Sequence, residues 1–324
     1  MELPPILQIA FSYYHVLAVF GLPANLLTIV ILYRANCGLS KGVTFYLLGM
    51  TTVDLLVIVS NVMVYYILYY YFPFSFLNYT AVRRLNEVIN YAAIDCSVWF
   101  TVTFTFDRFV AICCQKLKAK YCTERTAVLV TVTVCVVFSL KNVPLYFAFE
   151  PVSIMNHVEW GAEIKPSYHM LPCWLAFDWL DTVLCPLAPY LLILFFNALT
   201  IRHILMVSRI RRGFQGHRTC GNDSDPEMQS RRKSIILLFA ISGTFIVLWM
   251  PYVLFFLLSR ITFNHYNPSD YTDPFLIAEY TGDMFQLLSS CTNTCIYALA
   301  QTKFRKELSN AIKYPFTLVV NLVK

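Results

Sequence analysis

The sequence predicts an all-α membrane protein, a bundle of seven transmembrane helices followed by a short amphipathic eighth helix. Only 14% of the 324 residues are charged and 58% are hydrophobic, whereas about a quarter of a soluble domain is charged. The chain therefore has too little polar material to coat a water-facing surface, and its mean hydropathy is +0.58. Its apolar residues form seven stretches, each at or above the roughly 20 residues that cross a bilayer.

These stretches define the predicted elements, and they are 9–33, 43–72, 82–113, 126–148, 174–206, 234–259 and 271–300. The third and seventh are the least uniformly apolar, so we expect them to face the bundle interior. From Thr302 to Tyr314, Phe304, Leu308 and Ile312 recur every four residues among basic residues, a pattern typical of a helix in the membrane interface. We divide the chain into a seven-helix domain, 1–300, and an amphipathic helix with a short cytoplasmic tail, 301–324.

Basic residues predict the orientation, because cytoplasmic loops are rich in lysine and arginine. They gather after the first, third and fifth stretches and in the tail, while the opposite loops carry acids such as Glu159 and Asp273. We expect an extracellular N-terminus, a cytoplasmic C-terminus, and a first stretch that acts as the signal anchor. Asn78 begins an Asn-Tyr-Thr sequon on the outer side and is a candidate glycosylation site.

Polar residues inside the apolar stretches are costly and are candidates for function. They occur in this order: Asn25, Asp54, Asp107-Arg108-Phe109, Trp249-Met250-Pro251 and Asn293-Thr-Cys-Ile-Tyr297. On these stretches and in this order they resemble the motifs of the rhodopsin-like, or class A, G-protein-coupled receptors over almost the whole chain. The phrases Gly-Leu-Pro-Ala-Asn-Leu-Leu-Thr and Val-Leu-Trp-Met-Pro look most like the orphan group called G-protein coupled receptor 139 and 142.

The resemblance implies a receptor of the plasma membrane that binds an extracellular small molecule or peptide and activates a heterotrimeric G protein. The orphan group adds an aromatic amino acid or peptide as the ligand and Gq as the G protein. Six residues would carry coupling and activation: Asp107, Arg108, Trp249, Pro251, Asn293 and Tyr297. Arg108 would meet the G protein, while Trp249 and Pro251 would let the sixth helix swing.

Asp54 is a candidate ligand for sodium, which the family holds beside this aspartate. With Ser97 and Asn293 it would offer oxygen ligands suited to a small hard cation. The alternative is a network of interhelical hydrogen bonds around a protonated acid. We expect no other cofactor, since no CxxC pair or His/Cys cluster has metal-ligand spacing.

The outer half of the bundle is acidic and aromatic. The predicted ligand-binding residues are Glu87, Asn90, Tyr91, Asp181, Trp249, Tyr252 and Asp283. Such a pocket would suit a ligand with a positive group. Two alternatives stay open: Lys141 could neutralise Asp95 or Asp181 internally, with Asp178 nearby, or the acids could be protonated. We interpret the tyrosines between Tyr65 and Tyr71 as a membrane-interface belt, with a cation–π wall for the ligand as the alternative.

Three departures from the family pattern carry expectations of their own. Thr294 replaces a proline, so the seventh helix should be less kinked. Arg83 stands where the family has a cysteine, so Cys173 in the second outer loop should be a free thiol. At the start of the sixth stretch, Arg231-Arg232-Lys233 stands where many relatives have an acid. We expect it to repel Arg108 and to allow partial signalling without ligand.

Other classes of protein fit the sequence less well. A channel or transporter also carries acids in the membrane, but the sequence shows no internal repeat of the kind that many transporters have. No catalytic constellation indicates an enzyme. Leu287 occupies the place of the retinal-binding lysine, which argues against a photoreceptor. The expected partners are therefore a G protein, an extracellular ligand and membrane lipids, with no nucleic acid.

Overall fold

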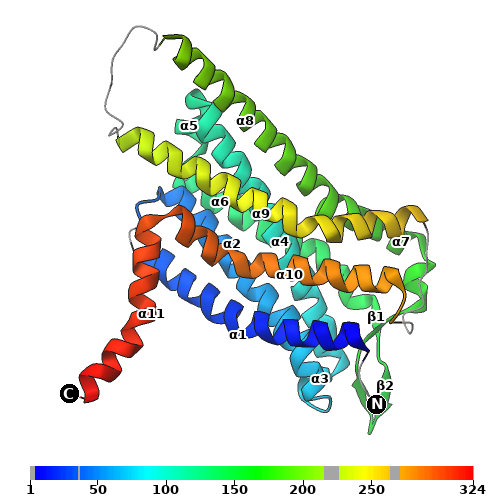
Figure 1. Cartoon of the computed structure of the whole chain (residues 1–324). Coiled ribbons are helices and arrows are strands. Elements are labelled where there is room, and N and C mark those ends of the chain that lie inside the picture. The colour runs from blue at the N-terminus through cyan, green and yellow to red at the C-terminus, as the bar shows by residue number, and fades with distance from the viewer. Residues whose placement is uncertain (1–3, 36, 215–225, 263–270, 324) are drawn as a thin grey trace.

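The computed structural model describes residues 4–35, 37–214, 226–262 and 271–323, and within them seven long helical units lie side by side (Figure 1). The units are α1 (Pro5–Arg34); α2 (Lys41–Val57) with the π-helical η1 (Ile58–Leu68) and α3 (Tyr69–Tyr71); α4 (Thr80–Cys113); α6 (Glu124–Asn142) with η3 (Val143–Phe147); α7 (Pro172–Thr182) with η5 (Val183–Leu187) and α8 (Ala188–Phe214); α9 (Pro226–Thr262); and α10 (Pro274–Ala300). Each contains most of one predicted stretch, which confirms the all-α seven-helix bundle.

Six of the helices in the described ranges are long and apolar enough to cross a membrane; they begin at Pro5, Lys41, Thr80, Glu124, Pro172 and Arg231. The helix α10 is not among these six. It packs along α9 and α1 in the bundle all the same, and it carries the acids Glu279 and Asp283. Its polar content fits the expectation that the seventh stretch faces protein.

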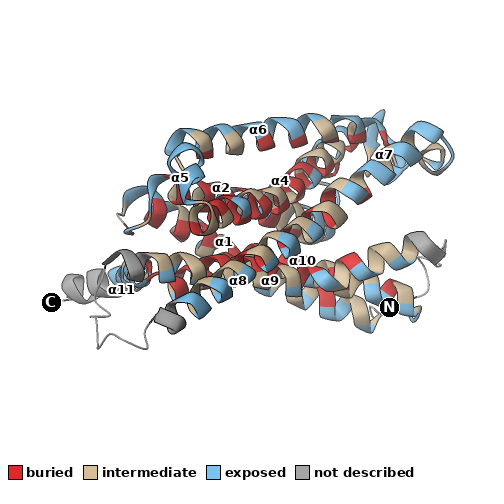
Figure 2. Cartoon of the chain, turned by 90° about the horizontal axis from the view of Figure 1, so that it is seen from above, coloured by how far each residue is buried: buried red, intermediate tan, exposed pale blue. Residues whose placement is uncertain are grey.

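Burial differs sharply between the helices (Figure 2). In the most apolar part of α4, 61% of the residues are buried, against 17% in α6. This places the third span at the centre of the bundle, as its mixed composition predicts, and leaves most of the leucines and valines of α6 facing outward. Exposure of an apolar side chain to lipid costs no hydrophobic free energy, whereas its exposure to water does. The outward face of α6 is therefore stable only within a membrane.

Polar caps begin several helices. Ser40 accepts a hydrogen bond from the backbone N–H of Val43 at the start of α2, and Thr123 does the same for Thr126 at the start of α6. Each cap satisfies a backbone N–H that the first helical turn leaves free.

The eighth helix is present and longer than predicted: α11 spans Thr302–Val323. It begins at the predicted residue and turns across the end of the bundle (Figure 1). The Phe304 side chain is fully buried, and its ring centroid lies 5.9 Å from that of Tyr297. Lys303, Arg305 and Lys306 are exposed, so α11 has the apolar and basic faces that the sequence indicates. We call this side of the bundle, which also holds Arg108, the Arg108 end.

The opposite side, here called the hairpin end, carries strands that the sequence did not predict. The strands β1 (Phe149–Glu150) and β4 (Glu163–Ile164) form one antiparallel pair; β2 (Ser153–Met155) and β3 (Val158–Trp160) form another. Asn156 and His157 both have positive φ in the turn between β2 and β3. Short 3-10 segments, η2 (Phe76–Asn78) and η4 (Pro166–His169), complete this end.

Packing holds this loop to the bundle where the family has a disulfide. The backbone N–H of Gly161 donates to the carbonyl of Asn78 at 2.8 Å. The ring of Trp160 stands edge-on to Tyr79 at 5.0 Å between centroids. The Arg83 guanidinium, in the place of the missing cysteine, lies 4.2 Å above the Tyr69 ring, a cation–π contact.

Cys173 is exposed and is a free cysteine. It lies in the first turn of α7 rather than in the loop where we expected it. The helix starts earlier than hydrophobicity suggests because Pro172 occupies its first position, where proline is well tolerated.

Candidate functional site

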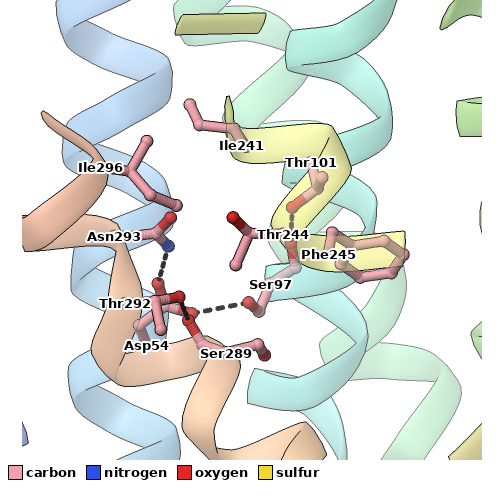
Figure 3. Close-up of a pocket in the computed structure, with 10 residues that line it drawn as sticks. All are labelled: Asp54, Ser97, Thr101, Ile241, Thr244, Phe245, Ser289, Thr292, Asn293 and Ile296. Atoms are coloured by element: carbon pink, nitrogen blue, oxygen red, sulfur yellow. Dashed lines mark hydrogen bonds between the residues drawn. The ribbon is translucent and has the colours of Figure 1, made fainter. Parts of the chain in front are cut away.

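A small polar cavity surrounds Asp54 in the middle of the bundle (Figure 3). One carboxylate oxygen accepts a hydrogen bond from the Ser97 hydroxyl at 2.6 Å, and the other accepts one from the Asn293 amide at 2.5 Å. The three predicted sodium ligands, from α2, α4 and α10, therefore meet around one carboxylate. The cavity holds about 20 Å³, which is room for about one water-sized species.

The lining of this cavity fits a small hard cation. Besides Asp54, its oxygen-bearing side chains are Ser97, Thr101, Thr244, Ser289, Thr292 and Asn293. Hydroxyl, amide and carboxylate oxygens are ligands that hard cations prefer. Within the described residues no cluster of three or more His, Cys, Asp or Glu side chains could hold a metal. The donor set therefore suits a monovalent ion with one carboxylate better than a transition metal.

Neighbouring polar groups connect the cavity to other helices. The Trp249 indole N–H donates to the Ser289 hydroxyl at 3.1 Å, which ties α9 to the wall of the cavity. Asn25 is not part of the cavity lining. Its amide donates to the backbone carbonyls of Gly21 and Ser290, which joins α1 to α10.

Thr294 makes a second tie between α10 and α1. Its hydroxyl lies 2.8 Å from that of Thr28 and 3.2 Å from the carbonyl of Ala24. No proline lies inside α10. Threonine keeps the backbone N–H that a proline would remove, so the seventh helix runs without a proline kink, as the sequence predicts.

Arg108 is held from two sides at the Arg108 end. Its guanidinium pairs with Asp107 of the same helix, and its Nη1 donates to the Ser234 hydroxyl of α9 at 3.1 Å. Arg231 donates from its Nη2 to the carbonyl of Ile112 at 3.2 Å. The sixth helix therefore offers Arg108 a hydroxyl partner, Ser234, beside the basic residues that we expected there, and their repulsion of Arg108 stays a prediction. Two hydrogen bonds join α4 to α9 here.

The short helix α5 (Gln115–Tyr121) follows α4 and leads to another contact with this motif. The thiol of Cys122 donates to the backbone carbonyl of Asp107 at 3.5 Å. Burial and the nearby Asp107 carboxylate raise the pKa of Cys122 to about 11. The thiol therefore keeps its proton at neutral pH and remains a donor to this carbonyl.

Towards the hairpin end, Lys141 lies between two acids. Its ammonium pairs with Asp95 of α4 at 2.7 Å and with Asp181 of α7. The amide of Asn142 donates to the same Asp95 oxygen that Lys141 contacts, also at 2.7 Å. Asp95 and Asp181 thus have Lys141 as an internal partner, which is one of the alternatives that the sequence left open. The cluster connects three helices by ion pairs. Because these groups are removed from water, loss of one partner would leave a buried charge unpaired.

Two other acids have no such partner. Glu87 is buried and Asp283 is half-buried, and within the described residues no Lys or Arg lies within ion-pair distance of either carboxylate. Asp283 is fixed beside α9 by close packing, since a Cβ at the preceding Gly282 would lie 3.1 Å from the Tyr252 Cα. A side chain at position 282 would force the two helices apart.

Tyr252 of α9 lies beside two of the other predicted ligand-binding residues. Its ring lies 5.8 Å from that of Trp249, and its backbone packs against Gly282, the neighbour of Asp283. Glu87 stands one helical turn from Tyr91 on α4. Asn90 is turned aside instead, because its carbonyl oxygen accepts a hydrogen bond from Ser60 at 3.4 Å.

The sequon residue Asn78 is buried. Only 6% of it is exposed, and its amide donates to the carbonyls of Tyr69, Phe72 and Pro73 at 3.4, 3.3 and 2.9 Å. These bonds close the turn that follows α3. A glycan on this nitrogen would compete with all three, so the geometry gives the amide a structural role, and glycosylation stays a prediction to be tested.

Sequence reasoning missed Ser234, Asn142 and Thr28. Ser234 follows Arg231-Arg232-Lys233 directly, and its position one turn beyond Arg231 was the available signal. Asn142 lies beside Lys141, and a polar pair at the end of an apolar helix could have been read as one unit. Nothing in the sequence indicated that Thr28 would face Thr294.

Comparison with known proteins agrees with this geometry. The family described as 7 transmembrane receptor (rhodopsin family) matches residues 24–297, so the chain belongs to the rhodopsin family of seven-transmembrane receptors. It is 24% identical to the C-C chemokine receptor type 1 of Macaca fascicularis, over 99% of this chain and 82% of that protein. It is 23% identical to the G-protein coupled receptor 39 of Bos taurus, over 94% of this chain and 72% of that protein.

The chain is also 24% identical to the substance-P receptor of Mus musculus, over 71% of this chain and 53% of that protein. Members of this family are G-protein-coupled receptors and not enzymes, so the chain is a multi-pass receptor of the plasma membrane whose partners are a G protein and an extracellular ligand. Family membership also decides against the channel or transporter alternative.

Proposed function

We propose that the receptor recognises a ligand with a positively charged group, a small molecule or a peptide, and that Glu87 and Asp283 bind that group. The observation that carries the proposal is the unequal pairing of the acids. Lys141 already occupies Asp95 and Asp181, whereas Glu87 and Asp283 have no cation at ion-pair distance among the described residues. A buried or half-buried carboxylate without a partner costs free energy that a cationic ligand would recover.

The similar proteins support a peptide or protein ligand. One is named for chemokines and another for substance P. The resemblance to the orphan group of G-protein coupled receptor 139 and 142 supports an aromatic amino-acid-like ligand instead, together with coupling to Gq. Tyr91, Tyr252 and Trp249 would then contact the ligand beside the two acids.

Activation would follow from the contacts between helices. The ligand would favour a packing in which α9 swings about Pro251, which lies inside that helix. The bonds that Arg108 and Arg231 make across α4 and α9 would break, and Arg108 would become free to meet the G protein. Sodium or water beside Asp54 would bind the closed packing more tightly than the open one. It would thereby stabilise the closed packing, since a ligand shifts an equilibrium only by its different affinity for the two states. Asn293 and Tyr297 lie on the helix between that cavity and α11.

The orientation follows from the same proposal. The hairpin end would be extracellular and the Arg108 end cytoplasmic, with the N-terminus outside and the C-terminus inside. The support is the distribution of charge: the tail and the loop after α4 carry Lys116, Lys118, Lys120, Lys303 and Arg305, and the loop after α6 carries Glu150, Glu159 and Glu163.

The test is an assay of G-protein dissociation in cells, with a panel of aromatic amino acids, amines and short peptides with free or acetylated amino termini. For an agonist found in this panel, Glu87→Gln and Asp283→Asn should each weaken activation by about 1 to 3 kcal/mol, the cost of leaving a buried polar group without its hydrogen-bond partner. This corresponds to roughly 5- to 150-fold in potency.

Glu163→Gln is the matched control, because Glu163 is exposed on the strand β4 at the same end. Surface expression should be equal in all variants. If both substitutions in the bundle leave potency unchanged, the two acids do not bind the ligand. If acetylated peptides act as well as free ones, the positive group is not what they recognise.

A further inference from the structure

The helix α9 carries a glycine that its packing does not require. A Cβ added at Gly243 would meet no atom of another described segment within 4 Å, whereas a Cβ at Gly282 of α10 would lie 3.1 Å from the Tyr252 Cα. Glycine in the interior of a helix disfavours that helix by about fivefold relative to alanine. Gly243 therefore weakens the middle of α9 although an alanine would fit there.

Gly243 lies on the face of α9 that points away from the bundle. At 100° per residue it shares this face with four large apolar residues that are all exposed: Ile236, Val247, Met250 and Leu254. Gly243 thus leaves a gap in a row of bulky side chains. A helix that bends towards its outward face brings the side chains on that face closer together. The gap at Gly243 leaves room for such a bend.

Ser242, the residue before this glycine, weakens the helix further. Its hydroxyl lies 2.7 Å from the carbonyl of Leu238, one turn earlier, and 3.1 Å from the side-chain oxygen of Asn197 on α8. Serine hydroxyls that bond to the preceding turn often bend helices, and Gly/Ser pairs are among the few places where helices kink sharply. Ser242 and Asn197 are both buried, so their contact holds this turn of α9 against α8.

A bend at Gly243 disturbs fewer contacts than a bend at Pro251. Trp249 lies between the two positions, where its indole N–H donates to Ser289 at 3.1 Å and its ring stacks on Phe245 at 5.1 Å between centroids. A swing about Pro251 alone would move both rings relative to Ser289 of α10. A swing about Gly243 would leave both rings in place and move only the part of α9 that precedes it, towards the Arg108 end.

The pair also lies at the depth of the Asp54 cavity. Ile241, Thr244 and Phe245, which stand on either side of the pair in the chain, line that cavity (Figure 3). A bend between them would change the wall of the cavity. The occupancy of the cavity and the straightness of α9 would therefore depend on each other.

We propose that Ser242–Gly243 is a second hinge of α9, at which the segment with Arg231 and Ser234 swings outward, and that Asn197 holds this hinge straight in the closed packing. The inference rests on the proposed swing of α9 and adds a pivot nearer the Arg108 end. Asn197 is a positioning residue in this scheme, because it acts on Arg108 only through the shape of α9.

The experiment measures how far α9 moves from α5. Spin labels are attached to unnatural amino acids at Lys120 of α5 and Arg232 of α9, both exposed at the Arg108 end. The full-length receptor in nanodiscs is measured alone and with each of several heterotrimeric G proteins freed of nucleotide. Double electron–electron resonance then gives the ratio of the open distance to the closed one.

Gly243→Ala should lower the open-to-closed ratio by about fivefold, because alanine favours the straight helix. Asn197→Leu should raise the ratio by about threefold, the average contribution of a hydrogen bond between helices in a membrane. The two effects have opposite signs, so a general loss of folding cannot produce both.

Two further variants test whether the effect belongs to the hinge. Gly243→Ala with Val247→Gly moves the glycine one turn along the same face and should restore part of the ratio. Ile236→Ala shortens a side chain on this face without adding a glycine and should leave the ratio at the wild-type value. A wild-type ratio in Gly243→Ala, or a fall that Val247→Gly does not reverse, would overturn the inference. If α9 does not move in the wild type or in Ser234→Ala with any G protein, the proposed swing itself is wrong, and the hinge with it.

Discussion

The hydrogen bond between Arg108 and Ser234 should restrain signalling in the absence of ligand. Ser234 is the residue through which α9 holds the Arg108 guanidinium, at 3.1 Å, and Ser234→Ala removes that hydroxyl while preserving the helix. Arg108 would keep Asp107 as a partner, but Asp107 lies on the same helix and cannot tie α4 to α9. We therefore expect Ser234→Ala to raise basal signalling.

The magnitude follows from the kind of bond. A hydrogen bond to a charged group contributes about 1.5 to 3 kcal/mol when buried. Ser234 is half-buried, so the lower end of this range applies, about 1.5 kcal/mol, which is roughly tenfold in an equilibrium constant. The open-to-closed ratio should therefore rise about tenfold. Arg231→Met, which loses the bond to the Ile112 carbonyl, should act in the same direction.

The assay is second-messenger output plotted against receptor density at the cell surface, with no added ligand. Ser259→Ala is the matched control, because Ser259 lies on the same helix and its hydroxyl bonds to the carbonyl of Phe256 one turn away. The slope should rise for Ser234→Ala and stay at the wild-type value for Ser259→Ala. An unchanged slope for Ser234→Ala and Arg231→Met, at equal expression, would refute the argument that these bonds close the Arg108 end.

Four further outcomes are expected. Sodium in place of potassium should raise the melting temperature of the purified receptor, and Asp54→Asn should abolish the difference; an equal melting temperature of the wild type in both salts would speak against a sodium site. Alkylation without reductant should label Cys173, and a disulfide-linked Cys173 would contradict the free thiol. Treatment with an N-glycosidase tests the glycan at Asn78: the sequon predicts a mobility shift that Asn78→Gln removes, whereas the buried amide predicts no shift in either. Lys141→Met should destabilise the receptor by about 3 to 5 kcal/mol, because it leaves buried acids unpaired, and adding Asp95→Asn should recover part of that loss; no loss of stability in Lys141→Met would show that the pairing contributes nothing.

The sequence alone determined the fold class and the family. Apolar stretches long enough to cross a bilayer leave few structures other than helices, because every backbone polar group must be satisfied within the segment. The order of the buried polar residues then indicated the family, and residues 24–297 match it. Asp54, Ser97 and Asn293 could be placed together in advance because the resemblance supplied their positions.

Only the tertiary structure decided which charged groups pair. Lys141 pairs with both Asp95 and Asp181, while Arg108 donates to Ser234 and Arg231 donates to the carbonyl of Ile112. Each pair joins residues on different helices that lie 40 or more positions apart in the chain. Hydrophobic pattern predicts which face of a helix is buried, but a hydrogen bond requires atoms within about 3 Å. The rotation and depth of each helix that set such distances come from the packing of all seven together.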